Sequence, residues 1–216
     1  MSLPLRLYGY WRSGAAYRVR IALALKGLAY DQANLDLRIE GHRSVTYRDV
    51  APQGLVPALE VGEGVLTQSL AIMEWLEERF PMPPLLPVAP LERAIVRAMA
   101  ECVACDIHPL NNLRVLTALR ADFAASRDQI DSWVARWIGE GFAALEVMIG
   151  RHGGAFAFGD APTLADCCLV PQVYSARRFG LDLKVFPNIR RADEHARALA
   201  QFAAADPSRQ PDADSA

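Results

Sequence analysis

The sequence predicts a mixed α/β domain followed by an all-helical domain. Strand-like alternation of apolar and polar residues occurs only in the first third of the chain. A proline-rich segment at residues 80–90 follows, with five prolines in eleven positions, and proline suits the interior of neither helix nor sheet. Beyond it only helical patterns remain. We therefore expect an α/β domain at residues 1–83, a linker at 84–90 and a helical domain at 91–216.

Short local signals predict the elements of the first domain. Ser13 begins a helix that Gly27 ends, because serine favours the N-cap and glycine the position after the last turn. A glycine turn separates two short strands within residues 56–66. Ser69 is placed to cap the next helix. The predicted order is strand 5–9, helix 15–26, strand 30–37, the two short strands and helix 70–80.

The second domain carries four predicted helices and a polar tail. Thr163 and Asp166 form a capping box, which we interpret as a folding device without a chemical role. Residues 205–216 are polar and rich in proline and aspartate, so we expect them to fray. The helices are expected at residues 91–121, 127–150, 163–179 and 187–203.

Composition restricts the classes of function. The 216 residues are 52% hydrophobic and 22% charged, with a net charge of −2. A nearly neutral chain has no general attraction for nucleic acid or an anionic membrane. No apolar stretch approaches the roughly 20 residues of a membrane span, and residues 1–10 lack the features of a signal peptide. We expect a cytoplasmic protein that binds neither nucleic acid nor a membrane.

The cysteines do not predict a metal site. Cys102 and Cys105 form a CxxC pair, but no second ligand pair follows, and the four histidines are scattered. A structural zinc site needs about four nitrogen or sulfur ligands at short spacing. We interpret the cysteines as small buried hydrophobic residues, expect no metal, and take this usage as typical of the cytoplasm. They lie at positions 102, 105, 167 and 168.

Arg12, Ser13 and Gly14 lie between the end of a strand and the start of a helix. Unpaired N–H groups and the helix dipole favour an anion at such a place. The serine hydroxyl can donate to that anion, and glycine lets a ligand approach the backbone. A plain N-cap needs only Ser13, so this segment alone leaves both interpretations open.

Two further places in the α/β domain suit a peptide-like anion. A cis bond between Val56 and Pro57 would expose the backbone of Val56 to a ligand that pairs as an added strand. Gln68 and Ser69 offer an amide, a hydroxyl and N–H groups to a carboxylate at a second helix start. Helix capping alone would also explain this second pair.

The sequence resembles the zeta-class glutathione transferases over essentially its whole length. The resemblance rests on WRSGAAYRVRIALALKG at residues 11–27, LVPAL at 55–59, QSLAIMEWLE at 68–77, DIHPLNNLR at 106–114 and GDAPTLADCCLVPQ at 159–172. It implies a thioredoxin-like N-terminal domain that binds glutathione, an all-α C-terminal domain, and a homodimer. A cleft between the two domains would be the usual place for the ligand.

The resemblance also implies residue roles. Ser13, Gly14 and Ala15 would surround the glutathione sulfur and, with Arg12, form the catalytic group. The cofactor's peptide would be held by His42, Val56, Gln68 and Ser69, and reached from the helical domain by Asp106, His108, Asn112 and Arg114. The substrate carboxylates would be bound by Arg12, Arg114 and Arg178, because guanidinium groups suit carboxylates.

Other observations leave alternatives open. The polar run at residues 106–114 interrupts an apolar helix, and His108 and Asn112, four apart, would share one face. That run is either an internal network around a kink at Pro109 or a polar wall facing a cleft, which we favour. A solvated helix end would explain one of the arginines at 177 and 178. Arg18 and Arg20 are expected to be structural, pairing with acids near the domain junction.

The implied activity is glutathione-dependent isomerisation of maleylacetoacetate to fumarylacetoacetate, a cis-trans change of an unsaturated dicarboxylate in aromatic amino-acid breakdown. Many zeta enzymes carry Ser-Ser-Cys where this chain has Ser13, Gly14 and Ala15. The reacting sulfur must therefore come from glutathione. Alternatives are isomerisation of the shorter maleylpyruvate, general conjugation of electrophiles, and a non-catalytic binding module on the same fold.

Overall fold

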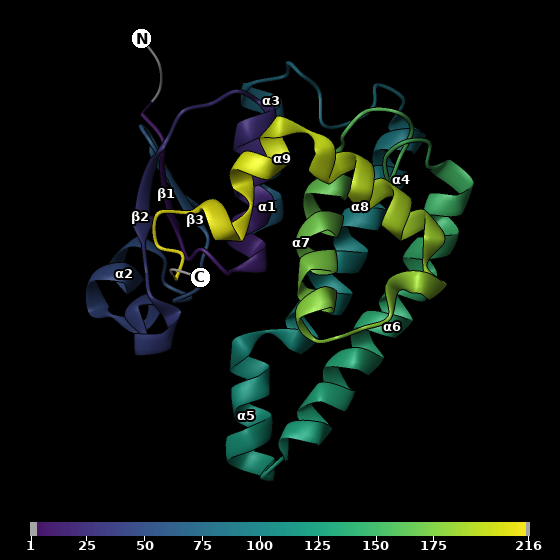
Figure 1. Cartoon of the computed structure of the whole chain (residues 1–216). Coiled ribbons are helices and arrows are strands. Elements are labelled where there is room, and N and C mark those ends of the chain that lie inside the picture. The colour runs from purple at the N-terminus through teal and green to yellow at the C-terminus, as the bar shows by residue number, and fades with distance from the viewer. Residues whose placement is uncertain (1–3, 215–216) are drawn as a thin grey trace. The chain divides into compact units, whose positions relative to one another are not determined.

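The computed structural model describes residues 4–214 and consists of two compact units (Figure 1). One unit is Met1–Leu85 together with Leu199–Ala216, and the other is Leu86–Ala198. An α/β unit and a helical unit are thus present as predicted, but the end of the chain groups with the α/β unit. A local reason is Arg20, which is buried in the α/β unit and donates a hydrogen bond to the carbonyl oxygen of Ala205.

A four-stranded mixed sheet forms the centre of the first unit, in the order β2-β1-β3-β4. β1 pairs with β2 in parallel and with β3 antiparallel, and β3 pairs with β4 antiparallel. The parallel pair needs a crossover connection, which α1 supplies. Leu7 and Leu59 face each other on β1 and β3 and are both buried. The strands are β1 (Arg6–Gly9), β2 (Asp31–Asn34), β3 (Ala58–Val61) and β4 (Gly64–Thr67).

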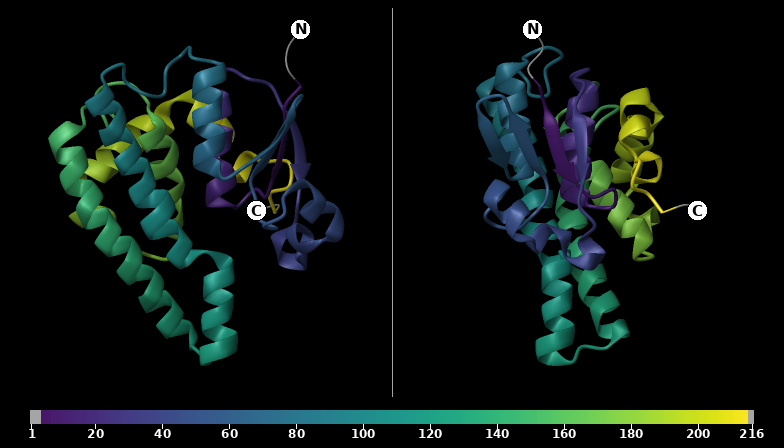
Figure 2. Two further views of the ribbon diagram at one scale, coloured as in Figure 1. Left: turned by 180° about the vertical axis from the view of Figure 1, so that it is seen from behind. Right: turned by 90° about the vertical axis from the view of Figure 1, so that its left-hand side faces the viewer.

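Helices α1 and α3 lie on one face of this sheet, and α2 lies toward the other (Figures 1 and 2). Gly27 ends α1 as predicted: its φ is +65°, and Leu28 N–H bonds back to Leu23 O at 3.0 Å. The observed strand β2 is shorter than the predicted strand 30–37, because the chain then turns into η1, η2 and α2, which the sequence does not predict. The elements are α1 (Gly14–Leu25), η1 (Leu37–Ile39), η2 (Gly41–Arg43), α2 (Val45–Val50), α3 (Ser69–Arg79), α9 (Ala200–Ala205) and η6 (Pro207–Arg209).

The second unit is helical, and α7 is its most buried helix, packed against both α4 and α8. The capping box at its start is confirmed: Asp166 Oδ2 accepts 2.8 Å from the Thr163 N–H, and Asp166 Oδ1 accepts 2.8 Å from the Ala157 N–H. The elements are α4 (Pro90–Glu101), η3 (Cys102–Ile107), η4 (His108–Asn111), α5 (Leu113–Phe123), α6 (Arg127–His152), α7 (Leu164–Arg178), η5 (Leu183–Val185) and α8 (Pro187–Ala198).

Two helices that the sequence predicts as continuous are broken. The predicted helix 91–121 passes through a π-helical turn, η3, and a 3₁₀ turn, η4, before α5 begins. Pro109 explains the change, because it has no N–H with which to continue the helical ladder. The predicted helix 187–203 breaks at Leu199, whose backbone is extended with φ −75° and ψ 138°.

Two further predictions are corrected. Cys167 and Cys168 are buried as expected, but Cys105 is exposed and Cys102 is half-buried. Residues 205–214 do not fray: Gln210 Nε2 donates to the carbonyl oxygens of Ala204 and Asp206, at 3.1 and 2.9 Å. Residues 215–216 lie outside the described part of the chain. Within residues 4–214, no three metal-binding side chains gather, and no helix is long and apolar enough to cross a bilayer.

Candidate functional site

The start of α1 presents hydrogen-bond donors. Ser13 is the N-cap, with φ −69° and ψ 117°, and its Oγ accepts a 3.2 Å hydrogen bond from the Ala16 N–H. Because this oxygen accepts, the hydroxyl hydrogen remains available to an anion. Helix geometry leaves the N–H groups of Gly14 and Ala15 outside the intrahelical ladder. The helix start therefore offers one hydroxyl, two N–H groups and the positive end of the dipole.

Arg12 adds a positive charge next to this helix start. Its guanidinium lies over the Trp11 ring, 5.2 Å from the ring centroid. Hydrogen bonds from Arg38 lower the pKa of Asp36, and the charge of Arg12 contributes a smaller part of that effect. A guanidinium that stacks on a ring keeps its edge donors for a carboxylate. Arg12 is thus suited to bind an anion beside Ser13.

Gln68 and Ser69 begin α3, but Ser69 is not the cap that the sequence predicts. Gln68 is the N-cap, with φ +68°, a region that costs a residue with a side chain roughly 1–3 kcal/mol. Its Nε2 donates to Gln53 Oε1 at 2.7 Å. Ser69 is the first helical residue and is buried, and its Oγ accepts 3.1 Å from Arg18 Nη1. Backbone strain of this kind concentrates at binding sites.

The Val56–Pro57 bond is cis, which is the condition under which a ligand could pair with Val56. The side chain of Val56 packs against a small buried cluster that includes Tyr47. The Tyr47 hydroxyl donates to the Leu55 carbonyl oxygen at 2.7 Å. This packing and this hydrogen bond, both of which involve Tyr47, hold the backbone that precedes β3.

His42 lies in η2, half-buried, near the same loop. A Cβ built on Gly54 would come 3.0 Å from the His42 carbonyl oxygen, so the two backbones are in close approach. Burial, followed by the nearby charge of Arg43, lowers the pKa of His42 and favours the neutral ring. Its Nδ1 is buried and makes no hydrogen bond to any residue within 4–214. A ligand group could satisfy that nitrogen.

In the helical unit, the predicted polar run serves partly as a helix start. Asn112 caps α5 by accepting a 3.1 Å hydrogen bond from the Arg114 N–H. His108 begins η4, so His108 and Asn112 do not share one helical face, contrary to prediction. Asp106 and Arg114 are exposed. The kink is therefore real, and two charged side chains of the run are accessible.

Arg178 lines an open pocket of about 690 Å³ at the end of α7. Its guanidinium lies over the rings of Phe179 and Tyr174, 5.7 and 6.0 Å from their centroids. Arg177 instead pairs with buried Asp193 at 2.5 Å, so its role is structural, but it acts in an ion pair and not at the solvated helix end that the sequence suggests. The pocket is cationic, and its lining is Arg120, Ala125, Arg127, Asp131, Arg178, Phe179 and Gly180.

The sequence matches two family descriptions in chain order. Residues 7–84 match "Glutathione S-transferase, N-terminal domain", and residues 131–201 match "Glutathione S-transferase, C-terminal domain". A maleylacetoacetate isomerase of Pseudomonas aeruginosa is 50% identical over 211 residues, which cover 96% of this chain and 98% of that protein. The chain belongs to the glutathione S-transferase family.

Solved structures agree with the fold of this transferase. A holo maleylpyruvate isomerase, described as a bacterial zeta-class enzyme, has a TM-score of 0.95 and 48% identity, covering 97% of this chain and 100% of that one. An Anaeromyxobacter dehalogenans maleylacetoacetate isomerase with bound dicarboxyethyl glutathione and citrate has a TM-score of 0.90 and 49% identity, covering 99% of both chains. These relatives place the transferase in the zeta class.

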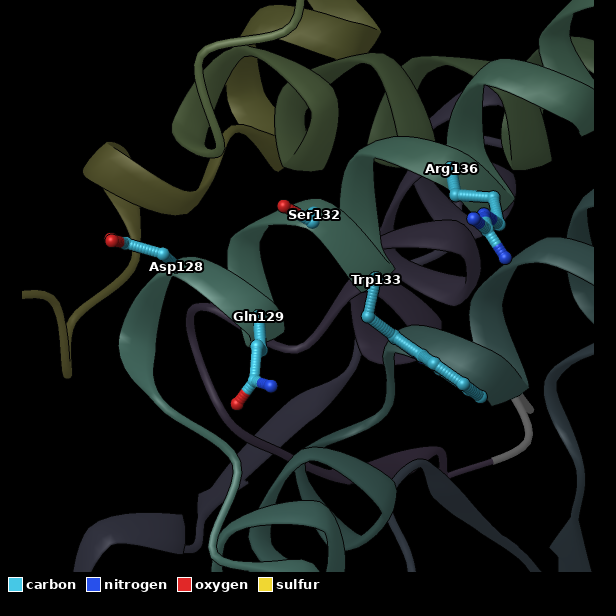
Figure 3. Close-up of a pocket in the computed structure, with 5 residues that line it drawn as sticks. All are labelled: Asp128, Gln129, Ser132, Trp133 and Arg136. Atoms are coloured by element: carbon cyan, nitrogen blue, oxygen red, sulfur yellow. The ribbon is translucent and has the colours of Figure 1, made fainter.

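A second pocket of this transferase, of about 340 Å³, contains none of the predicted site residues. Figure 3 shows its side chains projecting from successive turns of α6. Trp133 is fixed there, because its indole N–H donates to the Leu110 carbonyl oxygen at 2.7 Å. The lining is Asp128, Gln129, Ser132, Trp133 and Arg136.

Sequence reasoning missed some contributors to the site. Gln53, which binds the Gln68 side chain, lies in a turn and gave no signal of its own. Arg18 and Arg20 are buried; Arg18 donates to the Ser69 hydroxyl, and Arg20 donates to the carbonyl oxygens of Ala205 and Trp11. Arg120 and Arg127 were not singled out, since exposed arginines on helices are common.

Proposed function

We propose that this zeta-class transferase is a glutathione-dependent cis-trans isomerase whose substrate is maleylacetoacetate. The observation that carries the proposal is the start of α1, where the Ser13 hydroxyl and two N–H groups are free to donate to an anion and the neighbouring residues are glycine and alanine. Two relatives that are named as isomerases support it: they are 50% and 48% identical to this chain over nearly its whole length. The cofactor is glutathione, which supplies the sulfur.

The first task of the protein is to ionise the glutathione thiol. A free thiol has a pKa of about 8.5, so little of it is thiolate at neutral pH. Lowering that pKa by about two units needs about 2.7 kcal/mol of preferential stabilisation of the thiolate. One hydrogen bond to an ionised acceptor contributes roughly 1.5–3 kcal/mol. The Ser13 hydroxyl, aided by the Gly14 and Ala15 N–H groups and the dipole, can meet this requirement.

The thiolate then adds to the cis double bond of the substrate. A carbon–sulfur bond forms, and the π electrons move onto the conjugated carbonyl oxygen as an enolate. The former double bond is now single, so the chain rotates about it. The enolate then re-forms the double bond in the trans geometry and expels the thiolate. A relative binds dicarboxyethyl glutathione, a thioether between glutathione and a four-carbon diacid, and such a ligand supports the addition step.

Three arginines are proposed to hold the substrate. Arg12 lies beside Ser13 in the α/β unit, Arg114 is exposed in the first turn of α5, and Arg178 lines the cationic pocket. Guanidinium groups bind carboxylates through paired hydrogen bonds and stabilise the negative charge of an enolate. The chain has no overall positive charge, so these local groups must supply the attraction.

The residues proposed to bind the peptide of glutathione are those that the sequence resemblance implies. In the α/β unit these are His42, with its unmet Nδ1, Val56 beside the cis bond, and the Gln68–Ser69 pair at the start of α3. In the helical unit they are Asp106, His108, Asn112 and Arg114. The Asn112 amide nitrogen can donate to a carboxylate while its oxygen caps α5.

Maleylpyruvate is the second candidate substrate, because the holo relative of 48% identity is a maleylpyruvate isomerase. The chemistry is the same on a shorter diacid. We further propose a homodimer in the cytoplasm that acts in aromatic amino-acid breakdown. Exposed apolar side chains such as Val65, Met82 and Leu91 are candidates for the dimer contact. The molar mass of the purified protein, measured by light scattering, would test whether it is a dimer.

Turnover assays with each maleyl substrate and a substoichiometric amount of glutathione test the proposal. We expect many turnovers per glutathione, with a higher kcat/KM for maleylacetoacetate. Ser13→Ala and Arg178→Ala should each lower kcat/KM by about tenfold or more, since each removes a hydrogen bond to a charged group. Arg190→Ala, which changes an exposed arginine of α8, is the control. Unchanged turnover in both site variants would refute these roles.

A further inference from the structure

The loop that precedes Ser13 is held by hydrogen bonds that come from three places in the sequence: the loop itself, α1 and the end of the chain. Within the loop, the Ser13 N–H donates to the Tyr10 carbonyl oxygen at 3.0 Å. The Trp11 N–H instead donates to Asp212 Oδ2 at 2.9 Å, across 201 positions of sequence. An aspartate near the end of the chain thus supplies the acceptor for the backbone two residues before Ser13.

A buried guanidinium makes a second link between the loop and the end of the chain. Arg20 is 1% exposed and donates through Nε to Ala205 O at 3.1 Å, and through Nη2 to Trp11 O at 2.9 Å. A longer contact of 3.5 Å joins Nη1 to Tyr10 O. Burial lowers the pKa of Arg20 to about 10, so the group is still charged at neutral pH. The Arg20 guanidinium therefore joins the loop to the last turn of α9.

The end of the chain is itself anchored on the same unit. Gln32 Nε2, from β2, donates to Gln210 Oε1 at 3.1 Å. Arg38 Nη1 donates to Asp214 Oδ1 at 2.9 Å, in an ion pair whose side chains are about half exposed. Asp212 thus lies two residues after the anchored Gln210, whereas the exposed Arg38–Asp214 pair adds little to the hold on the segment. It can hold the Trp11 N–H without the freedom of an unanchored tail.

We propose that residues 205–212 position the loop Tyr10–Ser13, and that Asp212 thereby sets how tightly the start of α1 binds glutathione. This inference rests on the proposed function for its cofactor. Asp212 is a positioning residue: it touches the backbone of the loop, and its effect on the thiolate is transmitted through Ser13. A catalytic hydroxyl needs a placement accurate to within about 0.5 Å, so a loop without its acceptor would bind the sulfur less well.

The test compares three substitutions in the full-length protein. Asp212→Ala removes the acceptor, Asp212→Asn keeps an amide oxygen in its place, and Asp214→Ala breaks only the exposed ion pair of the same segment. Calorimetry gives the Kd for glutathione, and absorbance gives the pKa of the bound thiol. Amide hydrogen exchange of the peptide that covers Trp11 reports the loop without any ligand.

We expect Asp212→Ala to raise the Kd by about five- to tenfold, which is the size of one ordinary hydrogen bond, because Asp212 acts on the bound sulfur only through the loop. It should also raise the pKa of the bound thiol and speed exchange at Trp11. Asp212→Asn should recover most of each change, and Asp214→Ala should stay within about twofold of the unchanged protein. Equal Kd and equal exchange in Asp212→Ala and the unchanged protein would overturn the inference. If the unchanged protein bound no glutathione, the proposed function would fail, and the exchange rates would still decide whether Asp212 holds the loop.

Discussion

Alanine at Gly141 should destabilise the helical unit, whereas alanine at Gly139 should stabilise it. Both glycines lie in α6, two positions apart, so intrinsic helix propensity affects them alike. A Cβ on Gly141 would lie 2.2 Å from Cγ1 and 2.3 Å from Cδ1 of Ile107, the last residue of η3. A Cβ on Gly139 would meet nothing within 4 Å.

These distances give the size of the effect. Carbon atoms in contact lie about 3.5–4.0 Å apart, so Ile107 would have to move by more than about 1 Å. Ile107 is fully buried, so it cannot move out of the way into solvent. Overpacking of this kind costs about 1–3 kcal/mol, against a gain of up to about 1 kcal/mol from replacing a helical glycine. Gly141→Ala should therefore lower the free energy of unfolding by up to about 3 kcal/mol, and Gly139→Ala should raise it by up to about 1 kcal/mol.

Equilibrium unfolding in urea, followed by circular dichroism, measures the difference between the two variants. We expect a separation of about 1–3 kcal/mol with unchanged slopes. Ile107→Ala removes both crowded atoms, so its own cost should be smaller in the Gly141→Ala background than in the unchanged protein. Equal midpoints for the two glycine variants would refute the packing argument.

Three other predictions concern strain, charge and an ion pair. Gln68→Gly should stabilise the fold by up to about 1 kcal/mol, because it relieves the positive φ, and should weaken glutathione binding as much as Gln68→Ala does. Urea unfolding measures the change in stability, and calorimetry measures the change in binding. Tighter glutathione binding by the glycine variant would contradict this prediction. Burial raises the pKa of Asp166 to about 6, so its contribution to stability is full below its unfolded value and is lost as the pH rises through 6. The unfolding free energy of the protein relative to Asp166→Asn should thus fall by about 2 kcal/mol between pH 4.5 and 7.5, and a flat difference would count against the raised pKa. Glu77→Gln should lower the free energy of unfolding in urea by about 3–5 kcal/mol, because it leaves the charge of Lys26 buried without its carboxylate. The double variant Lys26→Met, Glu77→Leu removes both charges and should lower it by less. The reverse order of the two variants would exclude this explanation.

Local chemistry could be predicted from the sequence wherever one short segment decides the outcome. Gly27 ends α1 because only glycine enters the left-handed region without cost, and the glycine is visible in the sequence. The capping box of Thr163 and Asp166 needs residues only three apart. Ser13 follows the same rule as the N-cap of α1. The resemblance added the cofactor and the residue roles, which spacing alone could not supply.

Features that depend on distant segments could not be predicted. Nothing near Asp212 indicates that it accepts from the Trp11 N–H, because the two residues meet only after folding. The polar tail therefore resembled a frayed end. Ser69 looked like a cap, since serine is a common N-cap, but Arg18 on another helix binds its hydroxyl. Pro109 predicted a kink without specifying the π-helical turn before it.

The most direct test of the account is a pH titration of glutathione bound to the protein, followed by the ultraviolet absorbance of the thiolate. A free thiol is half ionised near pH 8.5, and we expect the bound thiol to be half ionised about two pH units lower. Ser13→Ala should return the midpoint most of the way to the value of free glutathione. A bound thiol that titrates at the free value in the unchanged protein would contradict the claim that the start of α1 stabilises the thiolate.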